Sequence, residues 1–397
     1  MTSRRVVLGG LAAGGLTVLA GCATDSGEPP GSVTPNPSDR SPGGDSSTSA
    51  ASSPSSPASS PSGAAGLSLE AQVGQLIMVG HDRPQLDNAT RDLLTTHQVG
   101  SLLLLGNALG PSSGIRAMTM ELEALDLAAP IIVAVDQEGG QVQRLNGEGF
   151  SRIPDAVAQS AMAPAELERA WVEWGAELAG AGVHYNLAPV ADVVPADNVS
   201  RNAPIGQLRR HYGTTNAAAI PSLRAVVGGL SAAGVATSLK HFPGLGRVSV
   251  NTDFGVAVDT VTSATDEELS PFVEAIEAGA SSVMVSSAIY EQIDPGQQGV
   301  FSSKVITDIL RGRLGFEGVV IADDLGAAVA VKDVTPGERA LRFLRAGGDL
   351  VITADPGLVE EMVSAVLDVA RSDEAFADEL ALKAGRVLAL KDSVLPA

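Results

Sequence analysis

The sequence predicts an α/β protein, a (β/α)8 TIM-type barrel that forms a single domain after an N-terminal tether. Eight short apolar runs recur from Leu67 onward, and most have apolar side chains on consecutive positions, as expected for parallel strands that are covered on both faces. Longer amphipathic stretches separate several of these runs. The 44 glycines and 23 prolines are too many for a helical bundle, and aromatic residues at 3% argue against an antiparallel sandwich.

The expected strands cover residues 75–79, 101–105, 131–136, 183–188, 236–240, 282–286, 319–323 and 350–353. Helical patterns between them cover residues 164–181, 216–233 and 268–278. Eight such units fit a barrel, or a close relative with an irregular early strand. An open doubly wound sheet is the alternative, but no Gly-x-Gly-x-x-Gly follows the first strand and no Gly-x-x-x-x-Gly-Lys occurs.

Residues 1–22 have the form of a bacterial lipoprotein signal peptide. A head with Arg4 and Arg5 precedes an apolar run from Val6 to Ala20, which is too short to span a ~30 Å hydrocarbon core comfortably. A buried N-terminal helix is the alternative. The single cysteine of the chain, Cys22, stands where a lipoprotein signal is cut and lipidated, and residues 3–8 also resemble a twin-arginine signal. We therefore expect an exported protein, lipid-anchored through Cys22 to the outer face of the bacterial cell membrane.

Composition limits the partners and cofactors. Residues 23–66 are rich in Ser, Pro, Gly, Ala and Thr, which predicts a disordered linker before a domain at 67–397. A formal charge of −20 repels phosphate backbones, so we expect no nucleic-acid partner. One cysteine excludes an internal disulfide and a cysteine-clustered metal site, and the histidine spacing supports no metal. We expect no cofactor, and a monomer.

Charged residues gather where the expected strands end, which is where barrels place their sites. Strand three ends at Asp136, with Arg144 shortly beyond, and strand four leads to Asp192. Strand five ends in Lys240 and His241, and strand seven in the pair at 323–324. Together these positions predict a polar pocket ringed by carboxylates and two or three cations.

Three of these segments resemble signatures of glycoside hydrolase family 3. They are the run Val-Asp-Gln-Glu-Gly-Gly at 135–140, the run Lys-His-Phe-Pro-Gly at 240–244 and the run Gly-Val-Val-Ile-Ala-Asp-Asp-Leu at 318–325. The most similar subgroup is the single-domain β-N-acetylglucosaminidases of the NagZ type, and the resemblance runs from about residue 68 to the end of the chain. It implies the barrel fold and a retaining mechanism through a covalent glycosyl-enzyme.

The resemblance also implies roles for single residues. Asp323 matches the nucleophile, with its neighbour Asp324 expected to cap or pair. The substrate-binding positions are matched by Asp136 with its cationic partner Arg144, by Lys240 and His241, and by Arg210, although Arg209 remains an alternative because the match needs two extra residues. We expect cations such as Lys240 and Arg144 to keep the nucleophile ionised.

The loop after the Lys-His-Phe-Pro-Gly run departs from the family pattern. The subgroup places an Asp-x-His dyad there, with the histidine as acid/base, and this chain has Asn251 and Asp253 at those positions. We expect Asp253 to serve as acid/base and the Asn251 amide to hydrogen-bond it; the alternative is a solvated loop carboxylate. Phosphorolysis is disfavoured, because an ionised Asp253 repels phosphate.

Two classes of function follow. The first is an exported β-N-acetylglucosaminidase that removes terminal non-reducing GlcNAc from peptidoglycan fragments or related glycans. The second is a cell-surface glycan-binding protein of the same fold with weakened turnover. The presence of Asp323 favours the enzyme, because a binding protein does not need a nucleophile. A β-glucosidase is disfavoured, because those enzymes usually bring their acid/base from a second domain and none is visible after Thr353.

Overall fold

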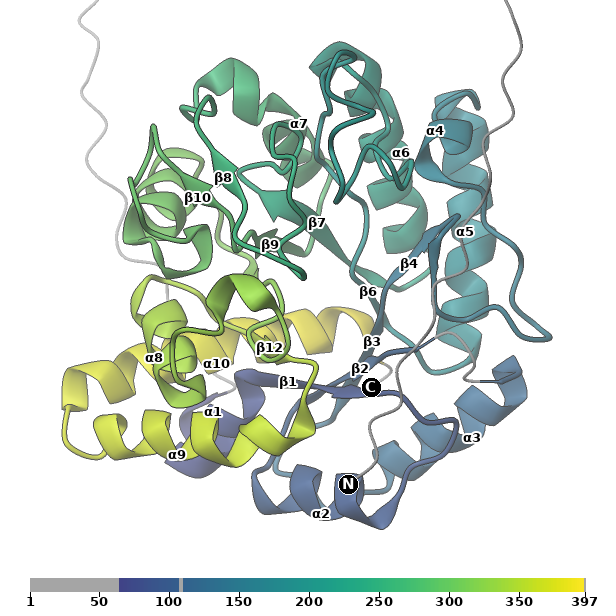
Figure 1. Ribbon diagram of the computed structural model, residues 1–397. Coiled ribbons are helices and arrows are strands. Elements are labelled where there is room, and N and C mark those ends of the chain that lie inside the picture. Colours follow the sequence, from purple (N-terminus) through teal and green to yellow (C-terminus); the bar gives the residue numbers. More distant parts are fainter. Residues whose placement is uncertain (1–63, 107–109, 396–397) are drawn as a thin grey trace, which may run out of the picture. The chain divides into compact units, whose positions relative to one another are not determined.

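The computed structural model describes residues 64–106 and 110–395, which form one barrel with an outer layer of helices (Figure 1). The signal peptide, the lipidation site Cys22 and nearly all of the linker expected from the sequence lie outside the described residues. The barrel strands are β1 (Ile77–His81), β2 (Ser101–Leu104), β3 (Ile132–Val135), β6 (Tyr185–Asn186), β7 (Ala236–Phe242), β9 (Ser282–Val285), β11 (Val319–Ala322) and β12 (Val351–Thr353).

The eight strands are all parallel and follow one another around the sheet in chain order. β1 pairs with β12, and a single bridge between Ile321 and Leu350 joins β12 to β11, so the sheet closes on itself. The predicted (β/α)8 class is therefore confirmed, and each expected strand occurs with ends shifted by a few residues. The longest is β7, which continues through Lys240 and His241 to Phe242.

Helices connect the strands as the amphipathic patterns predict. The three expected helices are α5 (Pro164–Gly180), α6 (Asn216–Ala232) and α7 (Asp266–Glu277). α7 begins with a capping box, in which the Thr265 side chain accepts from the backbone of Glu268 and the Glu268 side chain accepts in return. The other helices are α1 (Leu69–Gln75), α2 (Asn88–Thr96), α3 (Ser112–Glu123), α4 (Ala156–Gln159), a π-helix η3 (Lys304–Arg313), α8 (Pro336–Arg345), α9 (Val359–Ala370) and α10 (Glu374–Val394).

No helix in the described ranges is long and apolar enough to cross a membrane. Shorter elements complete the chain: the hairpin of β4 (Gln137–Gly139) and β5 (Val142–Gln143), the parallel pair of β8 (Val258–Asp259) and β10 (Ile289–Tyr290), and the 3-10 turns η1 (Ala64–Gly66), η2 (Gly299–Phe301), η4 (Val329–Val331) and η5 (Pro356–Leu358).

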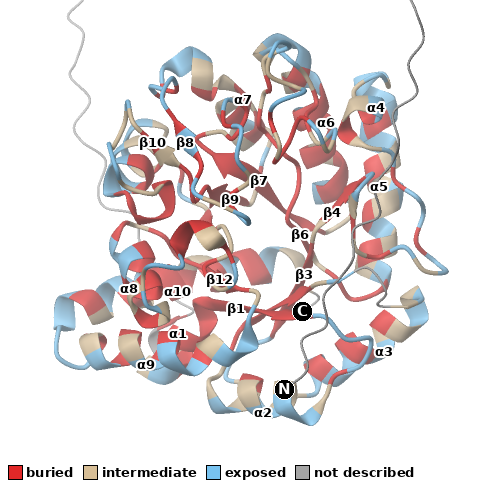
Figure 2. Cartoon of the chain, viewed as in Figure 1, coloured by how far each residue is buried: buried red, intermediate tan, exposed pale blue. Residues whose placement is uncertain are grey.

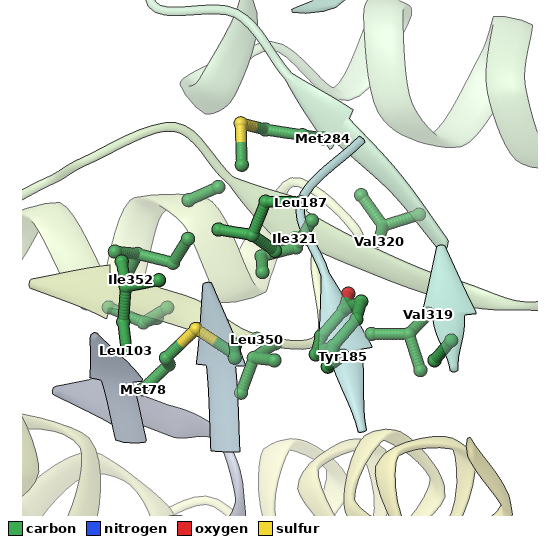
Figure 3. Packing of buried hydrophobic residues seen from close by; sticks show 14 of the residues in the cluster. Met78, Leu103, Tyr185, Leu187, Met284, Val319, Val320, Ile321, Leu350 and Ile352 are labelled. Atoms are coloured by element: carbon green, nitrogen blue, oxygen red, sulfur yellow. The ribbon is translucent and has the colours of Figure 1, made fainter. Parts of the chain in front are cut away.

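The core lies both inside the barrel and between the barrel and its helices (Figure 2). Apolar side chains from several strands and strand ends gather within the barrel, among them Met78, Leu103, Leu187 and Ile352 (Figure 3). The hydroxyl of Tyr185 is buried with them and has a partner, the Ser282 hydroxyl at 2.5 Å. Because this interior is filled, polar side chains collect at the strand ends, where the loops begin.

Candidate active site

A cavity of about 410 Å³ opens at the C-terminal ends of the barrel strands. β3 stops one residue before Asp136, β11 stops one residue before Asp323, and β7 carries Lys240. All eight side chains that the sequence proposes for catalysis and substrate binding line this cavity: Asp136, Arg144, Arg210, Lys240, His241, Asn251, Asp253 and Asp323. The fold thus brings together residues that are nearly 190 positions apart along the chain, as the ends of barrel strands do.

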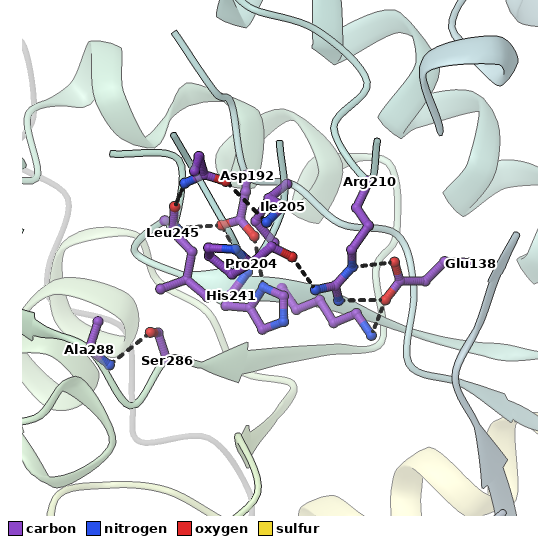
Figure 4. Close-up of polar contacts among 12 residues, drawn as sticks. Glu138, Asp192, Pro204, Ile205, Arg210, His241, Leu245, Ser286 and Ala288 are labelled. Carbon is purple, nitrogen blue, oxygen red and sulfur yellow. Dashed lines mark hydrogen bonds and ion pairs between the residues drawn. The ribbon is translucent and has the colours of Figure 1, made fainter. Parts of the chain in front are cut away.

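Two cations and two carboxylates form a connected network on one wall of the cavity. Figure 4 shows the part of this network in which Arg210 meets Glu138. The ammonium of Lys240 lies 2.6 Å from Asp136 Oδ1 and 2.6 Å from Glu138 Oε1. The guanidinium of Arg210 donates two hydrogen bonds of 2.8 Å to the carboxylate of Glu138, the bidentate geometry that fixes both groups. A third donor of Arg210 reaches the Pro204 carbonyl at 2.9 Å.

The network is charged at neutral pH. Burial alone would raise the pKa of Glu138, but the charges of Arg210 and Lys240 lower it far below its usual range. Burial likewise opposes the charge of Lys240, while Asp136 and Glu138 raise its pKa above the ordinary value. The side chain of Asp136 is 18% exposed, against 2% for Lys240 and 6% for Glu138. Asp136 is thus the member of the network that offers carboxylate oxygens to a ligand in the cavity.

The structure distinguishes Arg210 from Arg209, which the sequence left as alternatives. Arg210 lines the cavity, whereas Arg209 donates to Asp155 at 2.8 Å outside it. Arg209 has a φ of 57°, in the left-handed region, and is exposed. The two neighbouring arginines therefore face different surroundings, and Arg210 is the one available to a ligand.

His241 is held in place by a buried carboxylate. Its Nδ1 lies 2.7 Å from Asp192 Oδ2, and its backbone N–H donates to Asp192 Oδ1 at 3.1 Å. Asp192 also accepts from the backbone of Leu245 at 2.7 Å, so one carboxylate organises both the end of β7 and the loop after it. The peptide bond between Lys240 and His241 is cis. With Nδ1 engaged, Nε2 is the ring nitrogen of His241 that remains for a ligand.

Ionisation of Asp323 is disfavoured rather than favoured by its surroundings, contrary to what the sequence led us to expect. Burial raises its pKa to about 6, with the charge of His241 lowering it and the charge of Asp253 raising it further. The expectation that Lys240 keeps Asp323 ionised was wrong, because Lys240 is paired with Asp136 and Glu138 instead. A carboxyl with a pKa shifted this far, lying in a cleft, is typical of an active site.

Asp324 is a capping residue, as expected. Its carboxylate accepts hydrogen bonds of 2.8 Å from the backbones of Gly326, Ala327 and Ala354. Its own backbone N–H donates to Asp323 Oδ1 at 3.0 Å. Asp324 therefore fixes the loop after β11 and helps to orient its neighbour.

The loop at 246–255 brings Asp253 to the cavity. Gly246 is needed at its start, because a Cβ there would lie 1.9 Å from the Val193 carbonyl oxygen. The Asn251 side chain accepts from the backbone N–H of Asp253 at 3.0 Å, which closes a local turn. This geometry corrects the expectation that the Asn251 amide donates to the Asp253 carboxylate, because the side-chain oxygen of Asn251 is directed at the backbone.

The same loop is attached to the segment that follows Asp323. The backbone of Val329 donates to the Asp253 carbonyl at 3.3 Å, and that of Ala330 donates to the Thr252 carbonyl at 3.2 Å. Asp253 is exposed, yet it is close enough to Asp323 for its charge to raise the pKa of that residue. The two carboxyl groups therefore share one cavity, the minimum that acid/base-assisted displacement at a sugar requires.

Three residues of the site had no role assigned from the sequence. Glu138 lies inside the recognised 135–140 run and Asp192 at a strand end, so both positions carried a signal. Phe254 lines the cavity beside Asp253 and carried no signal at all. Within the described ranges, no group of three or more His, Cys, Asp and Glu side chains is arranged to hold a metal ion. The chemistry that these residues offer is nucleophilic attack by a carboxylate, proton transfer and fixed recognition of hydroxyl groups.

Comparison with known proteins gives a consistent assignment. A family model described as the N-terminal domain of glycosyl hydrolase family 3 matches residues 68–390. A protein named β-hexosaminidase from Xanthomonas oryzae pv. oryzae is 33% identical over 306 residues, which cover 73% of this chain and 87% of that protein. Another of the same name from Xylella fastidiosa strain M23 is 39% identical over 265 residues, with 63% and 76% covered.

Solved structures agree with these sequence matches. The crystal structure of the β-N-acetylhexosaminidase from Beutenbergia cavernae superimposes with a TM-score of 0.80 at 44% identity, covering 82% of this chain and 99% of that one. A family 3 β-N-acetylglucosaminidase from Paenibacillus sp. gives a TM-score of 0.76 at 31% identity, covering 82% of this chain and 62% of that one. The chain therefore belongs to glycosyl hydrolase family 3 and is a glycoside hydrolase.

Proposed function

We propose that this protein is a retaining exo-β-N-acetylglucosaminidase, which removes terminal GlcNAc from the non-reducing ends of peptidoglycan fragments. The observation that carries this proposal is the single cavity in which Asp323 and Asp253 meet the Asp136–Lys240–Glu138–Arg210 network. The similarity to β-hexosaminidases over most of their length supports hexosaminidase activity.

In the proposed reaction the Asp323 carboxylate attacks C1 of the terminal sugar and the bond from C1 to the glycosidic oxygen breaks. Asp253 gives its proton to that oxygen, and the rest of the glycan leaves as an alcohol. In the second step Asp253, now a carboxylate, takes a proton from water. The resulting oxygen attacks C1, which releases GlcNAc and restores Asp323.

The recognition residues have matching tasks. Asp136 accepts hydrogen bonds from sugar hydroxyls, and the donors of Arg144 and His241 Nε2 bind oxygens around the ring. Glu138 does not need to touch the sugar, because it holds Arg210 and Lys240 in place from behind. This arrangement places fixed charges before substrate arrives, so little reorganisation is needed when charge develops on the sugar.

The proposed location follows from the leader sequence. The apolar run from Val6 to Ala20, followed closely by Cys22, supports export and a lipid anchor on the outer face of the cell membrane. A membrane-anchored hydrolase in that place has cell-wall fragments as its nearest GlcNAc-containing glycans. The peptidoglycan substrate rests on this location.

The first test follows p-nitrophenol release by the full chain in detergent. We expect release from the β-N-acetylglucosaminide and not from the β-glucoside, and its loss in Asp323→Asn. A 5-fluoro glycosyl fluoride of GlcNAc is then expected to add one sugar mass to the peptide that contains Asp323. Binding of GlcNAc oligosaccharides without any turnover would instead establish the glycan-binding alternative. Release of GlcNAc from GlcNAc–MurNAc peptides, followed by mass spectrometry, tests the natural substrate.

A further inference from the structure

Phe254 is an unusual residue in this molecule because its aromatic ring is exposed. The chain has thirteen aromatic side chains, and among the described residues Phe254 is the exposed one, at 81%. The others are buried or half-buried, as Phe242 and Tyr290 are. Burying a large apolar side chain is worth about 1.5–3 kcal/mol, so a ligand that covers the Phe254 ring gains part of this free energy.

The position of Phe254 is set by the loop that carries the acid/base candidate. Its backbone N–H donates to the Asn251 carbonyl at 3.0 Å, within the turn that also holds Asp253. The turn is tied to η4 through the carbonyls of Thr252 and Asp253. Phe254 is thus presented on an anchored turn, and its ring forms part of the rim of the cavity.

Other exposed apolar residues lie near Phe254 in the sequence. Val250, Val256, Val258 and Val261 are between 40% and 60% exposed, and with Phe254 they supply five of the seven exposed large apolar side chains among the described residues. Of these five, Phe254 lines the cavity and the four valines do not. Exposed apolar groups beside a cleft are typical of a binding surface, and here Phe254 is the one placed to contact what the cavity binds.

We propose that Phe254 is the platform for the leaving-group sugar, so that the preferred substrate is a glycan with a second pyranose ring rather than a simple glycoside. This inference rests on the proposed function. The acid must lie within hydrogen-bond reach of the glycosidic oxygen, so the sugar beyond that oxygen passes beside Asp253 and meets the adjacent residue. The apolar C–H face of a pyranose covers an aromatic ring, while its hydroxyls stay in water at the rim.

The test compares two substrates that share the terminal sugar. N,N′-diacetylchitobiose has a second pyranose, and methyl β-N-acetylglucosaminide has none. We expect Phe254→Ala to lower kcat/KM for the disaccharide about tenfold more than for the methyl glycoside, a difference equivalent to ~1.4 kcal/mol. Phe254→Trp should restore the ratio. Val261→Ala, a matched exposed apolar position outside the cavity, should leave both values unchanged.

The possible outcomes distinguish a failure of the Phe254 platform proposal from a failure of the proposed function. An equal loss on both substrates in Phe254→Ala would overturn the platform and make Phe254 a support for the Asp253 loop. A wild type that hydrolyses neither substrate would overturn the proposed function. In that case calorimetry decides the platform: Asp323→Asn should bind the disaccharide about tenfold more tightly than Asp323→Asn/Phe254→Ala, and equal affinities would overturn it.

Discussion

Replacing the nucleophile candidate by its neutral isostere should stabilise the folded protein at neutral pH. The Asp323 carboxyl is placed among strand ends where burial, and the charge of Asp253, make its ionised form unfavourable. Asparagine keeps an oxygen that accepts from the Asp324 backbone, as Asp323 Oδ1 does at 3.0 Å, and carries no charge. Asp323→Asn therefore removes the unfavourable ionisation while keeping this contact.

The magnitude follows from the pKa. The pKa of Asp323 rises from 3.8 to about 6 on folding, about two units, and each unit corresponds to about 1.4 kcal/mol. Because the folded state holds the proton more tightly, the stability of the wild type falls as pH rises between these two values, and the full difference is reached above pH 6. One side of Asp323 is accessible from the cavity, so about 3 kcal/mol is the upper bound at pH 7.5.

The assay is urea unfolding of wild type and Asp323→Asn at pH 4 and at pH 7.5, followed by circular dichroism. The variant should gain up to about 3 kcal/mol at pH 7.5 and close to none near pH 4, where the wild-type carboxyl is largely protonated. Asp324→Asn is the matched control: it weakens a cap with three backbone donors and should destabilise. Equal stability of wild type and Asp323→Asn at pH 7.5 would refute the reasoning.

Three other predictions concern the same site and the anchor. The acidic limb of the pH profile of kcat/KM should lie near pH 6, because attack needs Asp323 ionised. His241→Asn should move that limb to higher pH, because it removes a charge that lowers the pKa of Asp323. A limb that stays in place in the variant would contradict this. Glu138→Gln should lower the free energy of unfolding by about 3 kcal/mol and raise KM, because it removes the negative charge that pairs with the buried Lys240 and with Arg210. Calorimetry and initial rates would show the two effects. Cys22→Ser should move the protein from the membrane fraction to the soluble fraction on immunoblots, with unchanged distribution arguing against the lipid anchor.

The fold could be predicted because its strands are covered on both faces, which leaves consecutive apolar residues in the sequence. β11, with four buried apolar residues at 319–322, shows this most directly. β6 is the counterexample: only Tyr185 and Asn186 are in regular strand, although the buried segment that contains them, residues 185–192, is longer. The length of a buried segment depends on packing, whereas the length of a strand depends on the hydrogen bonds to its neighbours. The apolar pattern of a sequence reports burial and not these hydrogen bonds.

The motifs predict which residues belong to the site, but they do not predict which of these residues form ion pairs with one another. Whether Lys240 forms an ion pair with Asp323 or with Glu138 depends on the distances between strand ends in the folded barrel. The spacing of these residues along the chain does not give those distances. Arg209 and Arg210 are adjacent in sequence, and the left-handed φ of Arg209 separates them in space. The raised pKa of Asp323 likewise arises from burial, a property of the assembled barrel.

The attachment of the Asp253 turn to η4 has a consequence for how such an enzyme can change over evolutionary time. Both ties use the carbonyl oxygens of Thr252 and Asp253, which every amino acid possesses. A substitution at position 253 therefore changes the side chain that lines the cavity there without releasing the turn. The position of this side chain and its chemistry can therefore change independently during evolution, because the hydrogen bonds to η4 do not involve the side chain of residue 253.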